Sequence, residues 1–239
     1  MIPIHFISIL RPLVATFLLF SFLHVSGQTI NESPKKPDYA LVIHGGAGAM
    51  ERSGMTPEAE AAYRDGLMKA LLAGEEVLKN GGTSIDAVIA SIILMEDNPL
   101  FNAGRGAVYN ENGEIAHDAS IMEGKEGRAG AVGATHIIRN PIAAAKAVMD
   151  DGRHVFLVGS GAEKFAISAG IDTVSPAYFF TQSRWSNYEK TKKTHLEREF
   201  PLDSKGTVGA VALDQDGNLA AGTSTGGMHY KREGRLCDS

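Results

Sequence analysis

Thr207 is the residue whose type and neighbours best suit nucleophilic chemistry in this sequence. It directly follows Gly206, and glycine adopts the unusual backbone angles of a strained peptide bond more readily than other residues. If the Gly206–Thr207 bond were cut, the new α-amino group, with an ordinary pKa of ~7.7–8.0, would be a base within reach of the Thr207 hydroxyl. We therefore predict that Thr207 becomes a nucleophile once it is a chain terminus.

A hairpin is expected to place a second hydroxyl beside Thr207. Gln215–Gly217 lies between two apolar runs and is typical of a three-residue loop closed by glycine. This loop pairs Asp214 with Asn218, and counting back along the ladder pairs Thr207 with Thr225. Directly opposed residues share a face, with Cβ atoms about 5 Å apart. A loop one residue longer or shorter would turn Thr225 to the other face. The alternative interpretation is that Thr207 is an ordinary strand residue.

Arg235 and Asp238 are a second pair of candidates, three residues apart. A guanidinium holds a carboxylate through two parallel hydrogen bonds, and a carboxylate accepts hydrogen bonds from an ammonium group. Together they have the charges that an amino-acid-like substrate requires. The alternative is a pair of solvated loop charges.

Other motifs in the sequence are incomplete. Gly222–Gly226 matches the G-x-S-x-G pattern of serine hydrolases, but that pattern requires a helix directly after the serine, and glycines follow instead. Gly159–Gly161 lacks the third glycine of a dinucleotide-binding loop. The eight histidines show no metal-ligand spacing, and we interpret His44 as structural. His117 and Asp118 are neighbours in a predicted strand and would face opposite sides, so they are not expected to form a dyad.

The remaining sequence predicts strands and helices that would position these residues. Strands are predicted at 39–44, 107–110, 115–120, 129–138 and 154–158, and helices at 57–79, 85–96, 141–149 and 162–169. Thr56 and Ser84 are expected to cap the first two helices. Residues 97–106 form a loop, and 183–199 is interpreted as a charged, partly helical linker before the cleavage site. Hairpins with helices on their outer faces indicate an α+β fold or sandwich.

Composition limits the class of protein. The chain has 239 residues, 44% of them hydrophobic and 21% charged, which suits one globular domain. Its net charge of −5 and the lack of a basic patch argue against nucleic acid as a partner. The single cysteine, Cys237, excludes an intrachain disulfide and a cysteine metal cluster.

Residues 1–27 have the pattern of a secretory signal peptide. Arg11 precedes the apolar run Pro12–Leu23, and small residues follow up to Gly27. The run is too short to favour a membrane span, although an uncleaved anchor is the alternative. We expect a secreted or periplasmic protein with no membrane segment after cleavage, and a disordered leader at 28–38.

Four segments carry a resemblance to a known family: Ile43–Gly48, Asn98–Gly104, Gly206–Asp214 and Asp216–Gly227. The chain resembles the isoaspartyl peptidase/L-asparaginase family, the plant-type asparaginases of the N-terminal-nucleophile hydrolases, from residue 39 to its end. The resemblance implies an αββα sandwich made as a precursor that cuts itself before Thr207. The α chain would cover 39–206 and the start of the β chain 207–239. Because the hairpin comes so late, we expect a truncated sequence and an incomplete sandwich.

The resemblance also implies roles for individual residues. Thr207 would be the nucleophile and Thr225 its hydroxyl neighbour, with Asn102 nearby. Arg235 would hold the substrate α-carboxylate and Asp238 the α-amino group. The implied reaction is hydrolysis of L-asparagine, or of the β-linked bond of an isoaspartyl dipeptide, through a β-aspartyl ester on Thr207. The implied assembly is a homodimer of processed αβ units, without a catalytic cofactor.

The loop over residues 95–105 resembles the sodium-binding loop of the family. The resemblance implies a structural sodium ion that is held by backbone carbonyl oxygens. The implied ligands are the carbonyls of Met95, Glu96, Asn98, Phe101, Ala103 and Arg105.

Three positions depart from the family pattern. His229 and Tyr230 stand where relatives usually carry Thr or Ser and then Asn, and Cys237 replaces a glycine, so bulk at these places is expected to reshape the substrate pocket. The family takes its oxyanion donors from a Thr-Gly pair beyond Asp238, and we therefore expect the chain as given to hydrolyse neither substrate. A glycosylasparaginase is one alternative, although its scissile bond is typically Asp-Thr, and a non-catalytic remnant is another.

Overall fold

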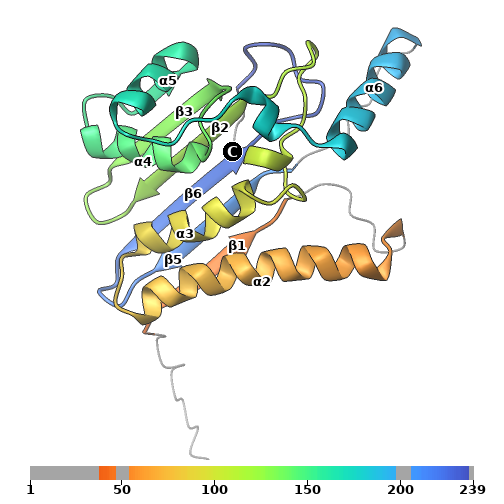
Figure 1. Cartoon of the computed structure of the whole chain (residues 1–239). Coiled ribbons are helices and arrows are strands. Elements are labelled where there is room, and N and C mark those ends of the chain that lie inside the picture. Colours follow the sequence, from red (N-terminus) through yellow and green to blue (C-terminus); the bar gives the residue numbers. More distant parts are fainter. Residues whose placement is uncertain (1–37, 47–53, 198–205, 237–239) are drawn as a thin grey trace, which may run out of the picture. The chain divides into compact units, whose positions relative to one another are not determined.

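The computed structural model describes residues 38–46, 54–197 and 206–236, with backbone only for 195–197 (Figure 1). Its centre is a six-stranded sheet whose neighbours are antiparallel, except that β3 and β4 are parallel. The strands, in spatial order, are β1 (Ala40–His44), β5 (Val208–Leu213), β6 (Leu219–Thr225), β2 (His117–Glu123), β3 (Ala129–Thr135) and β4 (Phe156–Val158).

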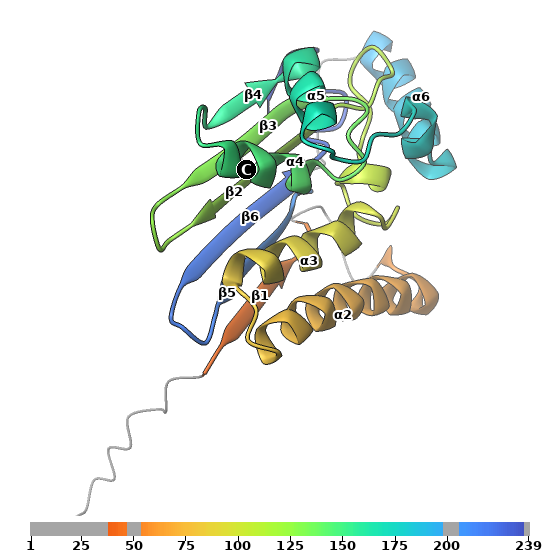
Figure 2. The same cartoon turned by 60° about the vertical axis from the view of Figure 1, so that its left-hand side comes forward.

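Helices cover one face of this sheet (Figure 2). They are α2 (Pro57–Lys79), α3 (Ser84–Glu96), α4 (Pro141–Asp151) and α5 (Gly159–Ser168). The helix α3 packs on β5 and β6, α4 on β2 and β3, and α5 on β3, while α2 packs on α3 and β1. The described residues also form a further helix, α6 (Gln182–Glu197), and two short 3-10 turns, η2 (Gly104–Gly106) and η3 (Pro176–Phe179). Within the described ranges, no helix has both the length and the apolar character needed to cross a membrane.

The other face of the sheet carries apolar side chains that remain exposed. Val42 lies opposite Val211, which lies opposite Ala221, which in turn lies opposite Met122. Val42, Val211 and Met122 are 67%, 49% and 52% exposed. The described chain therefore supplies one helical layer and one sheet, and the expected α+β class is confirmed.

The predicted register of the last hairpin is confirmed. The Asp214 N–H donates to the Asn218 carbonyl at 3.0 Å, and the ladder continues to Val208 opposite Ser224. Gly217 has φ +84° and donates its N–H to the Asp214 carbonyl at 3.0 Å, so it closes the three-residue loop in the left-handed region. This register fixes which side chains of β5 and β6 share a face.

The structure corrects several predicted boundaries. Thr56 caps α2 as expected, but the cap of α3 is Thr83 rather than Ser84, because the Thr83 hydroxyl accepts from the Asp86 N–H at 3.2 Å. The Ser84 N–H is bound instead by the Asp214 carboxylate at 3.0 Å. An acceptor 130 residues away thus takes part in starting this helix.

Other elements are shorter or longer than predicted. The segments 107–110 and 115–120 meet through a single bridge, Tyr109–Ile115, and β2 starts at His117, where it pairs with β3 and β6. The strand predicted at 129–138 ends at Thr135, after Ala134 turns to φ +50°. The strand predicted at 154–158 keeps three residues, and α5 begins at Gly159 rather than 162.

We predict that Asp214 contributes strongly to stability. Burial alone would raise the pKa of this carboxyl, but hydrogen bonds from Ser84 and Asn218 outweigh burial, and the pKa lies below its ordinary value. Asp214→Ala should lower the free energy of unfolding by about 2 kcal/mol, because two amides lose their acceptor. This deficit should be full at pH 7 and shrink below about pH 4, where the wild-type carboxylate also becomes protonated. Urea denaturation of the wild type and of Asp214→Ala, at pH 7 and below about pH 4, measures this difference in stability.

The exposed loop residue Asp216 provides the control for this measurement. Asp216→Ala should change the free energy of unfolding by less than about 0.5 kcal/mol. Equal losses in the two variants would show that Asp214 has no special part in joining the hairpin to α3.

Candidate active site

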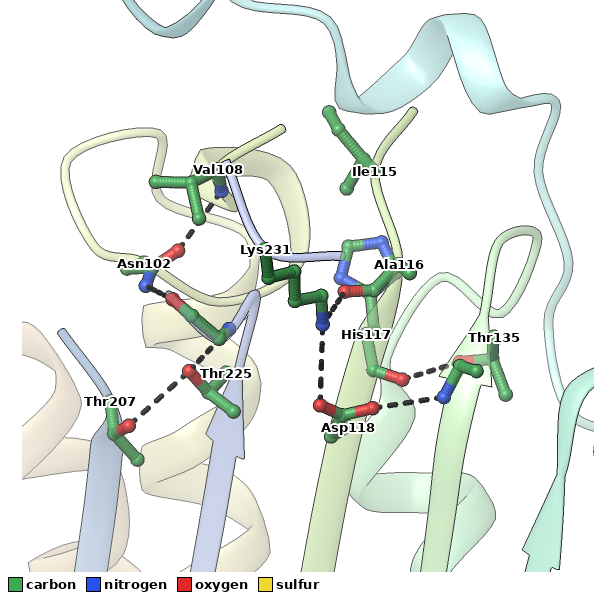
Figure 3. A network of polar contacts seen from close by, with 12 residues as sticks. Asn102, Val108, Ile115, Ala116, His117, Asp118, Thr135, Thr207, Thr225 and Lys231 are labelled. Carbon is green, nitrogen blue, oxygen red and sulfur yellow. Dashed lines mark hydrogen bonds and ion pairs between the residues drawn. The ribbon is translucent and has the colours of Figure 1, made fainter. Parts of the chain in front are cut away.

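Two threonine hydroxyls meet at one end of the sheet (Figure 3). Thr207 Oγ1 donates to Thr225 Oγ1 at 3.2 Å. Thr225 Oγ1 accepts a second hydrogen bond from the Gly227 N–H at 2.9 Å and donates its own proton to the Gly206 carbonyl at 3.0 Å. The donor and both lone pairs of the Thr225 hydroxyl are thus used, and its direction is fixed.

Asn102 supplies a second donor to the same carbonyl. Its Nδ2 donates to the Gly206 oxygen at 2.6 Å and to the Gly227 oxygen at 2.8 Å. Its Oδ1 accepts from the Val108 N–H at 3.0 Å, which sets the orientation of the amide. The carbonyl just before Thr207 therefore receives two hydrogen bonds, from Thr225 and Asn102. Donors at this oxygen would stabilise negative charge that develops on it.

Glycines let these segments approach one another closely. The Gly226 N–H donates to the Asn102 carbonyl at 3.0 Å, and a Cβ on Gly226 would lie 2.7 Å from Asn102 Oδ1. Gly46 has φ +126°, and a Cβ there would lie 3.5 Å from Gly206 Cα and 3.8 Å from the Thr207 nitrogen. Gly46 belongs to a segment that carried the family resemblance, but its place beside the Gly206–Thr207 bond was not predicted.

A buried ion pair lies on the other side of Thr225 (Figure 3). Asp118 is directly opposite Thr225 across β2 and β6. Lys231 Nζ lies 3.4 Å from Asp118 Oδ2 and donates to the Ala116 carbonyl at 3.2 Å, and the two side chains of the pair are 3% and 10% exposed. Asp118 Oδ1 accepts from the Ala134 N–H at 2.9 Å. This pair was not predicted, because in the sequence Lys231 stands among charged residues that are typical of a solvated loop.

His117 faces the opposite side from Asp118, as predicted. Its ring is fully buried and lies 4.4 Å from the Phe179 ring. Burial, together with the smaller electrostatic effects of Lys231 and His136, lowers the pKa of the imidazole to about 3. His117 is therefore neutral at ordinary pH and does not act with Asp118 as a dyad.

His229 and Tyr230, which differ from the residues expected from the family resemblance, both contact α6. Tyr230 has φ +61°, donates its N–H to the Tyr109 carbonyl at 2.8 Å, and stacks on Tyr188 at 5.9 Å. His229 Nε2 lies 2.9 Å from Thr191 Oγ1. A left-handed conformation is unfavourable for a bulky residue and better tolerated by Asn, which is a physical reason for the Asn that the family pattern has there. In this chain, stacking on Tyr188 offsets part of that cost.

The predicted substrate-binding pair is only partly described. Arg235 is half-buried in the turn after Lys231, and its N–H donates to the Arg232 carbonyl at 3.1 Å. Asp238, like the departure Cys237, lies outside the described residues. The role of this pair stays a prediction.

The loop expected to hold sodium has carbonyls turned toward its glycines. Gly104 has φ +49°, and a Cβ there would collide with the Glu96 carbonyl oxygen. A Cβ on Gly106 would collide with the Phe101 oxygen and lie 2.7 Å from that of Pro99. Each glycine thus lets a backbone carbonyl of the loop approach closely, and carbonyl oxygens are the type of ligand that a hard cation takes. In the part of the chain that the structure covers, no group of three His, Cys, Asp or Glu side chains could hold a metal ion.

Three of the other expected ligands already accept hydrogen bonds from backbone N–H groups. The carbonyls of Met95, Asn98 and Ala103 accept N–H bonds from Asn98, Phe101 and Gly106, at 3.3, 3.2 and 3.1 Å. The Glu96 side chain turns away to α4, where it accepts from the Ile142 N–H at 3.0 Å. Burial raises the pKa of the Glu96 carboxyl to about 8, so it adds little charge to the loop at neutral pH.

Comparison with known proteins gives the family. The profile of the asparaginase family matches residues 37–239. The chain is 44% identical to the isoaspartyl peptidase of Escherichia coli (strain K12) over 206 residues, 83% of this chain and 64% of that protein. It is 44% identical to the isoaspartyl peptidase/L-asparaginase of Bos taurus over 201 residues, with 83% and 64% covered. The Danio rerio isoaspartyl peptidase/L-asparaginase is 41% identical over 202 residues, with 83% and 63% covered.

These matches decide the family of the protein. The chain belongs to the asparaginase family. It spans a little under two thirds of the length of these three relatives.

We predict that His117 makes the protein less stable in acid. Because its native pKa is about 3 and its unfolded value about 6.5, the unfolded chain binds a proton between these pH values that the native state does not. This difference removes up to about 1.4 kcal/mol of stability per pH unit as the pH falls. His117→Phe should flatten the fall between pH 6.5 and 4. Urea denaturation at one-unit intervals measures it.

The exposed His154 supplies a matched control for this series. His154→Gln should follow the wild-type curve. Parallel curves for His117→Phe and the wild type would contradict the buried, neutral state of His117.

Proposed function

We propose that this chain carries the nucleophile of an autoprocessing threonine amidohydrolase that acts on L-asparagine and on β-aspartyl dipeptides. One observation carries the proposal: the Thr207 hydroxyl lies beside Thr225, and Thr225 and Asn102 both donate to the Gly206 carbonyl. The names of the relatives, isoaspartyl peptidase and isoaspartyl peptidase/L-asparaginase, support the substrate class.

Cleavage begins when Thr207 Oγ1 attacks the Gly206 carbonyl carbon. The hydrogen bonds run from the Thr207 hydroxyl to Thr225 Oγ1 and from Thr225 to the Gly206 oxygen, which is the direction in which a proton leaves the nucleophile. Thr225 and Asn102 stabilise the oxyanion that forms on Gly206. The C–N bond then breaks, the nitrogen takes up a proton, and an ester links Gly206 to Thr207. This step frees the Thr207 amine, and water then hydrolyses the ester to a Gly206 carboxylate and the free Thr207 hydroxyl.

The free amine then serves hydrolysis of the substrate. With an ordinary pKa of ~7.7–8.0, the α-amino group of Thr207 takes the proton of its own hydroxyl as Oγ1 attacks the substrate side-chain carbonyl. Ammonia, or the second residue of a dipeptide, leaves with a proton. A β-aspartyl ester on Thr207 remains, and water releases aspartate. Arg235 and Asp238 are the proposed partners of the substrate α-carboxylate and α-amino group.

A sodium ion in the loop 95–105 is a further part of the proposal. It is supported by the close approach of the Glu96 carbonyl to Gly104 and of the Pro99 and Phe101 carbonyls to Gly106. A bound cation would fix the loop that carries Asn102, and it would take no part in bond breaking.

Export is proposed on the sequence alone. Residues 1–27, which lie outside the described ranges, have the charge, apolar run and small residues of a signal peptide. We therefore propose a secreted or periplasmic protein.

We also propose, from the family resemblance, that the protein assembles as a homodimer of processed αβ units.

Self-cleavage is tested by intact mass and N-terminal sequencing of the purified protein. We expect two fragments, the smaller beginning at Thr207. Thr207→Ala should give one uncut chain, and Asn102→Ala should slow cleavage by about 10²-fold because the Gly206 oxygen loses a donor. Thr223→Ala is the control, since that hydroxyl bonds Ser120 at 3.0 Å, and it should cleave at the wild-type rate. A Thr207→Ala protein that is still cut at this bond would refute the assignment.

Substrate turnover is tested on the cleaved protein expressed from its complete gene. Ammonia should be released from L-asparagine and leucine from β-Asp-Leu, and Thr207→Ala should release neither. Ordinary α-linked Asp-Leu serves as the control dipeptide and should stay intact. Cleaved protein that acts on neither expected substrate would reject the substrate assignment and leave self-cleavage as a separate result.

A further inference from the structure

Arg184 is a half-buried cation on α6 that the proposed chemistry does not use. Its Nε donates to the Gly106 carbonyl at 2.7 Å, and its Nη2 donates to the Leu100 carbonyl at 3.2 Å. These two acceptors lie on either side of Asn102 in the sequence, within one loop. One guanidinium thus bridges both ends of the segment that carries Asn102.

The partners of Arg184 are unlike those of other arginines. Arg64, Arg128 and Arg139 each pair with a carboxylate, whereas both side-chain hydrogen bonds of Arg184 go to backbone carbonyls. Burial lowers the pKa of its guanidinium from the ordinary value, but an arginine stays charged in proteins. The fork geometry of a guanidinium suits two fixed acceptors at once, so the contact constrains the spacing of the two carbonyls.

The position of the Gly106 carbonyl affects the Asn102 side-chain amide through Val108. Gly106 is two residues before Val108, whose N–H donates to Asn102 Oδ1 at 3.0 Å. That bond leaves Nδ2 facing the Gly206 oxygen at 2.6 Å. If Gly106 shifted, Val108 would move with it, and the amide would lose the contact that sets which of its two ends faces Gly206.

The helix α6, which carries Arg184, is itself held in place by contacts with Tyr109 and His229. Trp185 and Tyr188, which follow it on α6, lie 5.2 and 5.6 Å from the Tyr109 ring. Thr191, one turn further on, contacts His229 at 2.9 Å. Arg184 therefore reaches the loop from a docked helix, as a group that fixes a site requires.

We propose that Arg184 is a positioning residue for cleavage of the Gly206–Thr207 bond, because its guanidinium fixes the loop that aims the Asn102 amide at the Gly206 carbonyl. The inference rests on the proposed self-cleavage for its consequence. The fixing of the loop is measurable without that reaction.

The first measurement is the rate of cleavage in the full-length protein, followed by intact mass. Arg184→Ala should slow cleavage about tenfold or more, since small displacements of a catalytic donor cost rate steeply. Arg184→Lys should slow it less, because an ammonium keeps the charge but not the fork. Methylguanidinium added to Arg184→Ala should restore part of the rate, whereas tetramethylammonium, which has no donors, should not.

The second measurement is amide hydrogen exchange in a Thr207→Ala background, which cannot cleave by the proposed route. The Val108 and Gly226 amides, which bond Asn102, should exchange about tenfold faster with Arg184→Ala. The Ala212 amide, near the hairpin end of β5, should be unchanged. Arg128→Ala is the matched control, because that guanidinium bonds Glu123 in the β2–β3 turn. It should alter neither exchange nor cleavage.

Each outcome decides the proposal. Wild-type cleavage and unchanged exchange in Arg184→Ala would overturn it. Faster exchange at Ala212 as well as at Val108 would assign Arg184 to general stability and overturn it too. If the wild-type protein does not cleave, self-cleavage is rejected, and with it the role of Arg184 in that step. Exchange at Val108 and Gly226 then decides whether Arg184 fixes the Asn102 loop.

Discussion

The pairing of β5 with β6 is the constraint on which the candidate site depends. It sets Thr207 beside Thr225 and turns both hydroxyls to one face. A slip of one residue would send every side chain of one strand to the other face, and the contact would disappear. The register is held at the closed end by Gly217 in the left-handed region and by Asp214, which bonds both the hairpin and α3. The chemistry at the open end is thus tied to turn geometry at the other end.

The second condition is that separate segments converge on one carbonyl. The Gly206 oxygen receives Asn102 from the loop after α3 and Thr225 from β6, and Gly46 lies against the same peptide bond. A Cβ on Gly226 would lie 2.7 Å from Asn102 Oδ1, so lack of space explains that glycine. Gly46 has room for a Cβ and is explained by its φ of +126°.

Polar groups around the site meet the cost of burial in different ways. Asp118 and Lys231 neutralise each other beside Thr225. Arg184 uses two carbonyls, and Glu96 and His117 are held in their neutral forms mainly by burial. Burying a charge is costly unless it is paired or removed, and each of these groups meets that requirement by pairing or by neutralisation. These groups are held in fixed positions around Thr207 and Thr225, whose hydroxyls donate to Thr225 Oγ1 and to the Gly206 carbonyl.

The sequence by itself determined the local elements and the pair of hydroxyls. Periodicity and caps predicted the helices, and the loop Gln215–Gly217 was enough to place Thr207 opposite Thr225, because hairpin register depends on neighbouring residues. The motif resemblance led to Asn102. Only the tertiary structure decided that Lys231 is buried, that Arg184 bridges Leu100 and Gly106, and that Ser84 is bound by Asp214. These contacts join residues many positions apart, and side chains of the same type look alike in sequence until packing decides which of them lose water.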